Sequence, residues 1–557
     1  MVDETSHISW PLIEKPWIMI LNHDGSQGEV SLYEVLERAH EIKEITGDIP
    51  QQVGPIYRFL DAIVRRAFFG EKLTYREAKD KWLDLWRRGS FDMTILGRYL
   101  HAHAEGFDLF GEHPFYQVPN LEYDAAKEFD PAVGLIADVP TKDEKFLFSQ
   151  RGKKAPARIS FAEAARWLIF CQCYDPAGIK TPVKGNTFKK EGKAYAPKGI
   201  PATGYLGNLG LTVIEGLNLF ETIMWNLALY DPADPDVRLF GVEDDLPPWE
   251  LPVPLSNMEV LPEPTGLVQL ETMQSRRLRL VPSEDGEAVV GYIACYGDMV
   301  HPVDAMSYET MTAKKQSKPQ QKRLGLPVAP FMPRPHDTRK AMWRGLSGLL
   351  AASDGLPNGM DDRPGVVRWM NAMCDALAEN GEEIDCFLPK SVTLRGQGIE
   401  YGTQSSVYVD GYDDRLVVGS ALAVDDEEAV SCALDLAKNV NLALKEVANL
   451  VCGIEKSKGN RALNNNAEAR QEDVITAAAS EVDDLFRLYL ADMTGDVDPY
   501  EHTAHWASKL RSRFIQIGSS VCESSDALMF GAHTGWTLAH AKAHFFNRIN
   551  GLLSTDC

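Results

Sequence analysis

The chain has 557 residues, about three to five times the length of a common domain, so it can bury more than one hydrophobic core. Hydrophobic residues form 44% of the chain and charged residues 25%, which excludes general disorder and a small fold held together by disulfides. The net charge of −23 argues against a protein that coats nucleic acid by attraction over its whole surface.

The cysteines and the first residues of the chain both favour a cytoplasmic location. The nine cysteines form no Cys-x-x-Cys pair, as expected of reduced thiols in a reducing compartment. The apolar run near the start, Trp17–Leu21, is too short to cross a membrane, and no basic segment precedes it. We therefore predict a cytoplasmic protein without a membrane segment.

Local signals predict helices and strands in an irregular order. Ser31-Leu32-Tyr33-Glu34 is a capping box that opens a helix predicted from about Leu32 to Ile45, and capping boxes also start at Thr74 and Ser160. Helical periodicity predicts further helices at residues 54–69, 76–88, 160–172, 211–229, 337–351 and 364–379. Alternating or β-branched residues predict strands at residues 265–271, 277–282, 288–296, 391–395 and 405–410. This order favours an α+β fold over a doubly wound sheet.

The last part of the chain has long helical patterns separated by short breakers. The patterns lie near residues 427–453, 466–494, 501–517 and 525–551. Long helices with short connections are typical of an up-down bundle. We therefore predict a large, irregular mixed α+β domain over residues 1–418, followed by a four-helix bundle over residues 419–557.

Histidines in this region offer one alternative function. His540 and His544 are four residues apart on a predicted helix, and His505 lies on the neighbouring helix, so the three could hold a metal in a metal-dependent enzyme. No Glu-x-x-His pattern accompanies them, and aromatic residues surround them, which favours histidines packed within the bundle. We predict no metal, no cofactor and no catalytic residue.

Two cationic loops flank the helix predicted after Ser160. In the first, basic residues surround the aromatic stretch Phe146-Leu147-Phe148, and in the second, residues 180–198 contain six lysines and one acid. Glycine lets the backbone approach a ligand closely, lysine neutralises phosphate, and an exposed phenylalanine can stack or wedge. This composition suits loops that meet a nucleic-acid groove, and a solvated lysine-rich loop explains it equally well.

The order and spacing of several motifs resemble one known family. The motifs are Glu14–Ile18, Val30–Leu36, His113-Pro114-Phe115-x-Gln117, Tyr174–Lys180, Met311-Thr312-Ala313 and Pro335–Leu346. Together they resemble CasA, the large subunit of the type I-E CRISPR surveillance complex called Cascade.

The resemblance implies a non-catalytic protein of antiviral defence. Members of the family assemble with other Cascade subunits and a guide RNA, and inspect double-stranded DNA for a short motif, the PAM, through the minor groove. They help to open the duplex, dock a helicase-nuclease, and leave the remaining sequence to guide pairing. The minor groove carries a degenerate pattern, so several PAMs could be accepted.

The resemblance also implies DNA-binding residues. An aromatic loop beside the PAM aligns with Phe148, Arg151, Lys153 and Lys154. A glycine loop against the minor groove aligns with the segment that contains Ile179, Lys180, Lys184, Gly185 and Asn186, followed by Lys189 and Lys190. A glutamine wedge that splits the first base pair aligns with Gln404, between two predicted strands.

The sequence departs from the family pattern at three places. Residues 181–185 replace a run of glycines, so the backbone would approach DNA less freely and Lys184 would supply a charge contact. Around Tyr296 there is no lysine to insert into the minor groove, which leaves Arg276 or Lys314 as candidates. The paired Cys-x-x-Cys zinc sites of some members are missing, so no structural zinc is expected.

Overall fold

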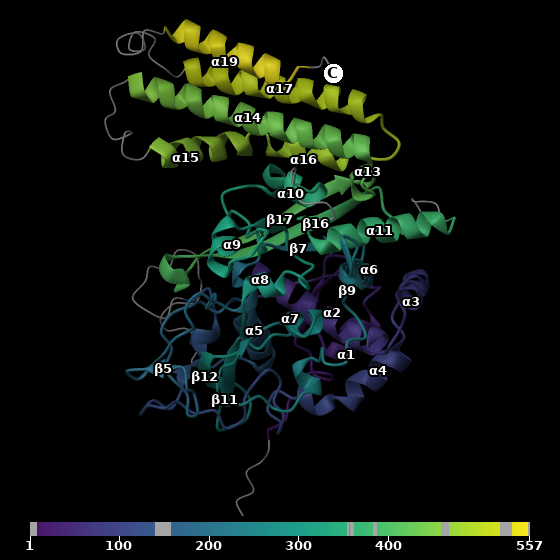
Figure 1. Cartoon of the computed structure of the whole chain (residues 1–557), viewed down its shortest axis with the longest axis vertical. Coiled ribbons are helices and arrows are strands. Elements are labelled where there is room, and N and C mark those ends of the chain that lie inside the picture. Colours follow the sequence, from purple (N-terminus) through teal and green to yellow (C-terminus); the bar gives the residue numbers. More distant parts are fainter. Residues whose placement is uncertain are drawn as a thin grey trace, which may run out of the picture. The chain divides into compact units, whose positions relative to one another are not determined.

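The computed structural model describes residues 8–139, 158–353, 356, 361–381, 387–457, 467–523 and 537–554 (Figure 1). The chain divides into two compact units. The first comprises residues 1–338, 356–369 and 395–413, and the second comprises residues 339–355, 370–394 and 414–557. The chain passes from the first unit to the second for the last time after residue 413, near the predicted boundary at residue 418. The second unit also contains residues 339–355 and 370–394, which lie before that boundary.

The first unit combines many short strands with helices of varied length. Its helices are α1 (Leu32–Glu37), α2 (Val53–Phe69), α3 (Tyr75–Arg88), α4 (Met93–Ala102), α5 (Phe161–Tyr174), α6 (Leu219–Asn226), α7 (Leu267–Glu271), α8 (Pro302–Ala305) and α9 (Lys318–Leu324). Its strands are β1 (Ile18–Asn22), β2 (Gln27–Val30), β3 (Ile42–Ile45), β4 (Asp130–Pro131), β5 (Lys189–Lys190), β6 (Lys193–Ala194), β7 (Leu211–Glu215), β8 (Tyr230–Asp231), β9 (Asp234–Arg238), β10 (Val260–Leu261), β11 (Arg276–Pro282), β12 (Val289–Tyr296), β13 (Met299–Val300), β14 (Lys314–Gln316) and β15 (Phe331–Pro333). The mixture of helix and strand in irregular order confirms the predicted α+β class.

Three small sheets organise the strands that matter for the site. The sheets have the orders β2-β1-β3, β11-β12-β4 and β17-β16-β7, where β16 spans Ser391–Tyr401 and β17 spans Tyr408–Gly419. In the β11–β12 ladder, Arg276 lies opposite Tyr296 at one end and Pro282 lies opposite Val289 at the other. This register places the first residue of β11 beside the last residue of β12.

The capping boxes at Ser31 and Thr74 are confirmed, and Ser160 caps its helix through its hydroxyl, whereas the predicted extent of the first helix is wrong. Ser31 Oγ accepts from Glu34 N at 3.1 Å and Ser31 N donates to Glu34 Oε2 at 2.9 Å, so the capping box of α1 is complete. The helix nevertheless ends at Glu37, because residues 42–45 pair with β1 as strand β3. Tertiary pairing overrides the local helical periodicity there.

Two further predicted elements change type. Residues 211–229, predicted as one helix, form strand β7 and helix α6 on either side of Gly216. Residues 265–271, predicted as a strand, contain helix α7, because the Asp245 carboxylate accepts from Val268 N at 2.9 Å and Gln269 N at 2.8 Å and caps its first turn.

The second unit is helical over its C-terminal part, as predicted. Its helices are α10 (Ser347–Leu350), α13 (Ser420–Ala423), α14 (Glu427–Ser457), α15 (Ala467–Ser480), α16 (Asp483–Ala491), α17 (Pro499–Glu523) and α19 (Leu538–Leu552), and α11 (Gly365–Glu379) contributes its second half. Helix α14 packs against α15, α17 and α19, and α17 packs against α16 and α19 (Figure 1). The second predicted pattern is broken between α15 and α16. Within the described ranges, no helix combines the length and the apolar character needed to span a membrane.

A cluster of buried charges joins α2 to α7 inside the first unit. Arg58 makes two hydrogen bonds to Glu309, at 2.9 and 3.0 Å, while Arg65 Nη2 lies 3.6 Å from Glu271 Oε1. Asp61, 1% exposed, lies in the same cluster. Burial raises the pKa of Glu271 to about 7 and, with the charge of Glu271, holds the pKa of Asp61 well above its ordinary value.

This cluster predicts that stability depends on pH through Glu271. The Glu271 pKa is raised on folding, so its contribution is complete below pH 4.5 and is lost as pH rises through about 7. Over that window, the free energy of unfolding of the wild type should fall by about 2–3 kcal/mol relative to that of Glu271→Gln, as measured by urea unfolding. Identical pH profiles for the two proteins would contradict the raised pKa.

Candidate nucleic-acid interface

Asp175 and Arg276 form the buried base of the lysine-rich loop. The Asp175 carboxylate accepts from Arg276 Nε at 2.5 Å and from Lys180 Nζ at 2.5 Å. Arg276 is 1% exposed and also donates to the carbonyl oxygens of Asp175, Pro176 and Ala202. Burial would raise the pKa of the Asp175 carboxyl, but the charges of Lys180 and Arg276 outweigh it and hold the pKa below its ordinary value. The network fixes the start of the loop to β11.

Tyr296 holds the next residues of the loop from the facing strand. Its hydroxyl accepts from Gly178 N at 3.2 Å and donates to the carbonyl oxygen of the same residue. Gly178 has a φ of +129°, which a residue with a side chain rarely adopts. The neighbouring Ile179 is 59% exposed, so the clamp leaves the outer surface of the loop accessible.

The segment 182–184 lies alongside the segment 122–124. Lys184 N donates to Glu122 O at 2.9 Å, and Asp124 N donates to Pro182 O at 2.8 Å. Beyond this point the loop forms the β5–β6 hairpin, in which Lys189 and Lys190 are exposed. Backbone hydrogen bonds therefore set the position of the lysines relative to the sheet.

The turn that carries Gln404 lies against the start of this loop. Gln404 is exposed, with a φ of +56°, and occupies the tip between β16 and β17. Ala177 N donates to Ser405 O at 2.8 Å, and a Cβ on Gly178 would lie 3.7 Å from Ser406 Cβ. The predicted wedge and the predicted glycine loop, more than 200 residues apart in the sequence, are thus neighbours in the first unit.

The predicted site residues differ in how accessible they are. Ile179, Lys184, Gly185, Lys189, Lys190 and Gln404 are exposed. Lys180 is held by Asp175, with 17% of its side chain exposed. Asn186 is 2% exposed and donates to Cys295 Sγ at 3.5 Å, so it supports the loop from inside. Phe148, Arg151, Lys153 and Lys154 lie outside the described residues.

Neither candidate for a residue inserted into the minor groove is accessible. Arg276 forms the base of the loop, and Lys314 is 6% exposed and lies 3.6 Å from Asp231 Oδ2. Burial lowers the pKa of Lys314, opposed by the negative charge of Asp231. Both residues bind protein carboxylates inside the fold, so the suggestion that either inserts into DNA is wrong for this conformation.

Two exposed aromatic residues were missed by the sequence reasoning. Phe188 and Tyr195, 40% and 41% exposed, flank the β5–β6 hairpin, and Tyr195 N donates to Phe188 O at 3.4 Å. Their position at the two ends of a segment that contains three lysines is the signal that could have found them, because aromatic rings beside cations provide stacking surfaces for bases.

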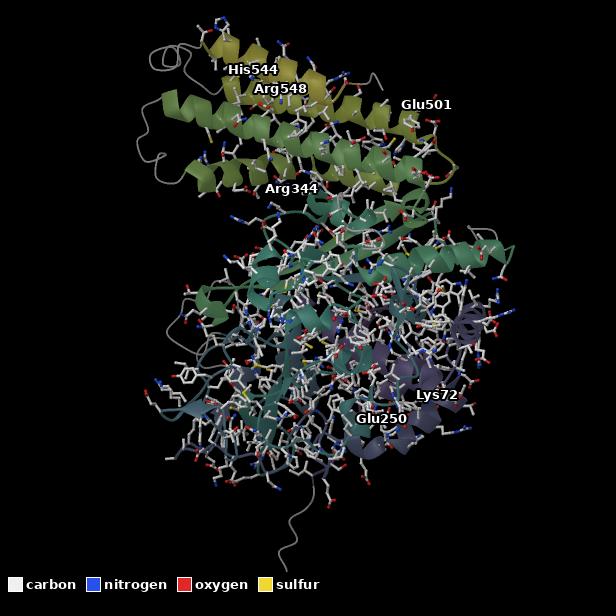
Figure 2. The ribbon with its side chains drawn as sticks, in the orientation of Figure 1. Lys72, Glu250, Arg344, Glu501, His544 and Arg548 are labelled. Carbon is white, nitrogen blue, oxygen red and sulfur yellow. The ribbon has the colours of Figure 1, made fainter. Side chains whose placement is uncertain are left out.

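The histidines of the alternative function lie on α17 and α19. His505 packs edge-on against Trp506, with ring centroids 6.1 Å apart. His540 and His544 lie on α19, and Figure 2 labels His544 there. No group of three or more His, Cys, Asp or Glu side chains that could hold a metal occurs within the ranges that the structure describes.

Comparison with known proteins gives the family. The family model described as CRISPR-associated protein Cse1 matches residues 11–517. The chain belongs to the Cse1 family. The CRISPR-associated protein CasA/Cse1 of Thermus thermophilus is 28% identical over 459 residues, which cover 80% of this chain and 79% of that protein. The resemblance to CasA inferred from the motifs is confirmed.

Solved Cse1 structures have the same fold. The crystal structure of Thermobifida fusca Cse1 is 27% identical, covers 99% of both chains and has a TM-score of 0.82. A chain of a structure described as a CRISPR RNA-guided surveillance complex has a TM-score of 0.67 at 19% identity, covering 98% of this chain and 99% of its own. This chain therefore shares its overall fold with solved Cse1 structures.

Proposed function

We propose that this chain is the non-catalytic large subunit of a type I-E CRISPR surveillance complex. In this proposal it binds other Cascade subunits and the guide RNA in the cytoplasm, inspects duplex DNA for the PAM through the minor groove, helps to open the duplex and docks a helicase-nuclease. Residues 1–418 inspect DNA, and residues 419–557 form the helical bundle. Family membership and the fold shared with a chain of a surveillance complex support it.

The contact between the lysine loop and the Gln404 turn carries the proposal. A loop that contains lysines and glycines is suited to contact phosphates and a DNA groove. An exposed side chain at a hairpin tip is suited to enter between base pairs. The hydrogen bond from Ala177 N to Ser405 O holds the loop beside the turn, which supports contact of both with one stretch of DNA. The local charge also reconciles DNA binding with a net charge of −23.

Copurification followed by duplex binding tests this function. The full chain should copurify with the guide-RNA complex, and the complex should bind target duplexes that differ only beside the target with different affinities. A complex that lacks this chain should lose that difference. A chain that fails to join the complex, or a complex whose preferences do not depend on the chain, would rule out the proposal.

A further inference from the structure

Two of the lysines that the proposed function assigns to DNA form ion pairs with acidic side chains. Glu122 accepts from Lys184 Nζ and Asp124 accepts from Lys189 Nζ. Each lysine lowers the pKa of the carboxyl that it binds, and Glu122 in turn raises the pKa of Lys184. In the free chain both cations therefore already have an anionic partner.

The fold, rather than chance contact between long side chains, sets this arrangement. Tyr123 and Val183 form an antiparallel bridge and are 4% and 0% exposed, so both belong to the core that supports β12. Alternate residues of an extended segment face opposite sides, so Glu122 and Asp124 both lie on the outer side, next to the lysines. The bridge therefore keeps the backbone of both acids beside the lysines, whereas their exposed side chains remain free to turn away.

We propose that Glu122 and Asp124 compete with DNA phosphates for Lys184 and Lys189 and so lower the affinity of the loop for every duplex. This inference rests on the proposed function. A duplex has to displace both carboxylates before the two lysines can neutralise phosphate. Phosphate contacts carry no sequence information, so the acids lower binding to every duplex and shorten the time spent on DNA without the recognised bases.

The ion pairs have the strength that such competition requires. Exposed fractions are 66% and 56% for the side chains of Lys184 and Glu122, and 40% and 44% for those of Lys189 and Asp124. Ion pairs this exposed are weak and are screened by salt, so DNA can displace them. A buried pair such as Lys180 with Asp175, 17% and 22% exposed, is less suited to exchange.

Part of the loop remains available for the first encounter with DNA. Lys190, Lys193 and Lys198 are exposed and form no ion pair with any residue that the structure describes. These three cations attract DNA, whereas Lys184 and Lys189 bind it only after the carboxylates leave. The acids therefore reduce the charge of the loop without removing its attraction.

Neutral isosteres of the two acids test the inference in the assembled complex. Glu122→Gln with Asp124→Asn should tighten binding about three- to tenfold at low salt, by the same factor for duplexes with and without the recognised bases. The gain should shrink as salt rises toward about 0.3 M, because salt also screens the ion pairs that the wild type has to break. The single variants should each give part of the gain.

A matched control separates a local effect from total charge. Asp80→Asn with Asp84→Asn removes two negative charges from exposed ion pairs on α3, which Figure 1 shows far from β5 in the same unit. This control should bind DNA as the wild type does. The inference is overturned if the Glu122 and Asp124 variants bind no more tightly than the wild type, or if the control gains as much.

The design also separates this inference from the proposed function. If the wild-type complex binds the recognised duplex and the acid variants change nothing, only the competition is wrong. If the wild-type complex shows no dependence on this chain when it binds duplexes, the proposed function has failed, and the inference fails with it.

Discussion

Replacing Arg276 with methionine is expected to lower the free energy of unfolding of the first unit by about 3–5 kcal/mol. The guanidinium is 1% exposed and donates to the Asp175 carboxylate and to the carbonyl oxygens of Ser275, Asp175, Pro176 and Ala202. Methionine fills part of the space but removes these hydrogen bonds, including the one to Ala202 O, and leaves Lys180 as the cation that compensates the Asp175 carboxylate. The loop of residues 175–180 should lose its fixed position.

Hydrogen exchange and urea unfolding of the full chain measure this effect. Amide exchange at residues 177–180 should accelerate by about two orders of magnitude or more, because local opening costs less free energy. Arg279→Met is the matched control on the same strand, since Arg279 is only half-buried and donates to Leu121 O at 2.8 Å. Equal losses of protection in the two variants would show that Arg276 has no special role in holding the loop.

Replacing Lys184 and Lys189 with glutamine is expected to weaken duplex binding by the complex about 10- to 60-fold at about 0.1 M salt. Each lost phosphate contact reduces the slope of log affinity against log salt by about 0.9, so two reduce it by about 1.8. Between about 1 M and about 0.1 M salt, this slope difference gives the upper figure. The lower figure takes account of the ion pairs with Glu122 and Asp124. The wild-type lysines have to break these pairs before they bind phosphate, so each phosphate contact contributes less to the affinity.

A pair of lysines elsewhere on the first unit is the control for charge. Lys72→Gln with Lys79→Gln removes the same charge at the start of α3, and Figure 2 shows Lys72 on the side of the unit away from β5 in Figure 1. This pair should leave both affinity and salt slope nearly unchanged. If the Lys184 and Lys189 variant retains the wild-type slope, these two lysines do not contact phosphate.

Local features of the fold could be predicted because they depend on neighbours in the sequence. The capping boxes at Ser31 and Thr74 are complete in the structure, since each needs only a hydroxyl and a carboxylate three residues apart. Alternating or β-branched residues predicted strands β11 and β12 in the same way, and apolar residues at helical spacing predicted the C-terminal helices. Strand β3 and helix α7 were missed because β1 and the Asp245 cap, respectively, decide their type from elsewhere in the chain.

The site could be predicted only in part, for the same reason. The lysines, the glycine and Gln404 are visible as composition and by resemblance, but their partners are distant in the sequence. Nothing near Lys184 indicates that Glu122 lies beside it, and nothing near Gly178 indicates that Tyr296 holds it. Sequence alone therefore suggests six similar lysines, whereas the structure separates a buried anchor, two paired cations and three exposed ones.

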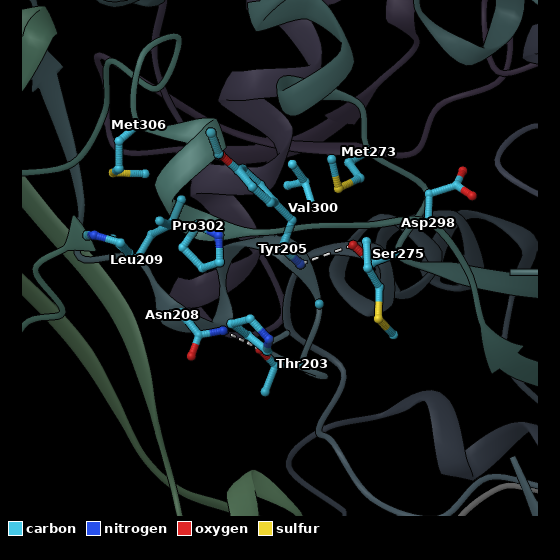
Figure 3. A pocket seen from close by; sticks show the side chains of 15 residues that line it. Thr203, Tyr205, Asn208, Leu209, Met273, Ser275, Asp298, Val300, Pro302 and Met306 are labelled. Atoms are coloured by element: carbon cyan, nitrogen blue, oxygen red, sulfur yellow. Dashed lines mark hydrogen bonds between the residues drawn. The ribbon is translucent and has the colours of Figure 1, made fainter. Parts of the chain in front are cut away.

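A small pocket beneath the same loop is explained by packing rather than by a ligand. Thr203, Tyr205 and Asn208 line it together with methionines and prolines, and Asn208 Nδ2 donates to Thr203 Oγ1 at 2.8 Å (Figure 3). Its free volume of about 30 Å³ suits roughly one water molecule. The pocket adjoins Gly204, whose N donates to Asp175 O at 2.9 Å, so it belongs to the support of the loop.

Opening of the first target base pair is the measurement that tests the central claim most directly. A fluorescent base analogue at that position reports strand separation in the complex, and Gln404→Gly removes the side chain while suiting the φ of +56°. Ser405→Gly, at a φ of +52° on the same turn, is the control. We expect Gln404→Gly to bind the duplex as the wild type does and to open it about tenfold less, with the control unaffected. Wild-type opening by Gln404→Gly would contradict the assignment of this turn as the wedge.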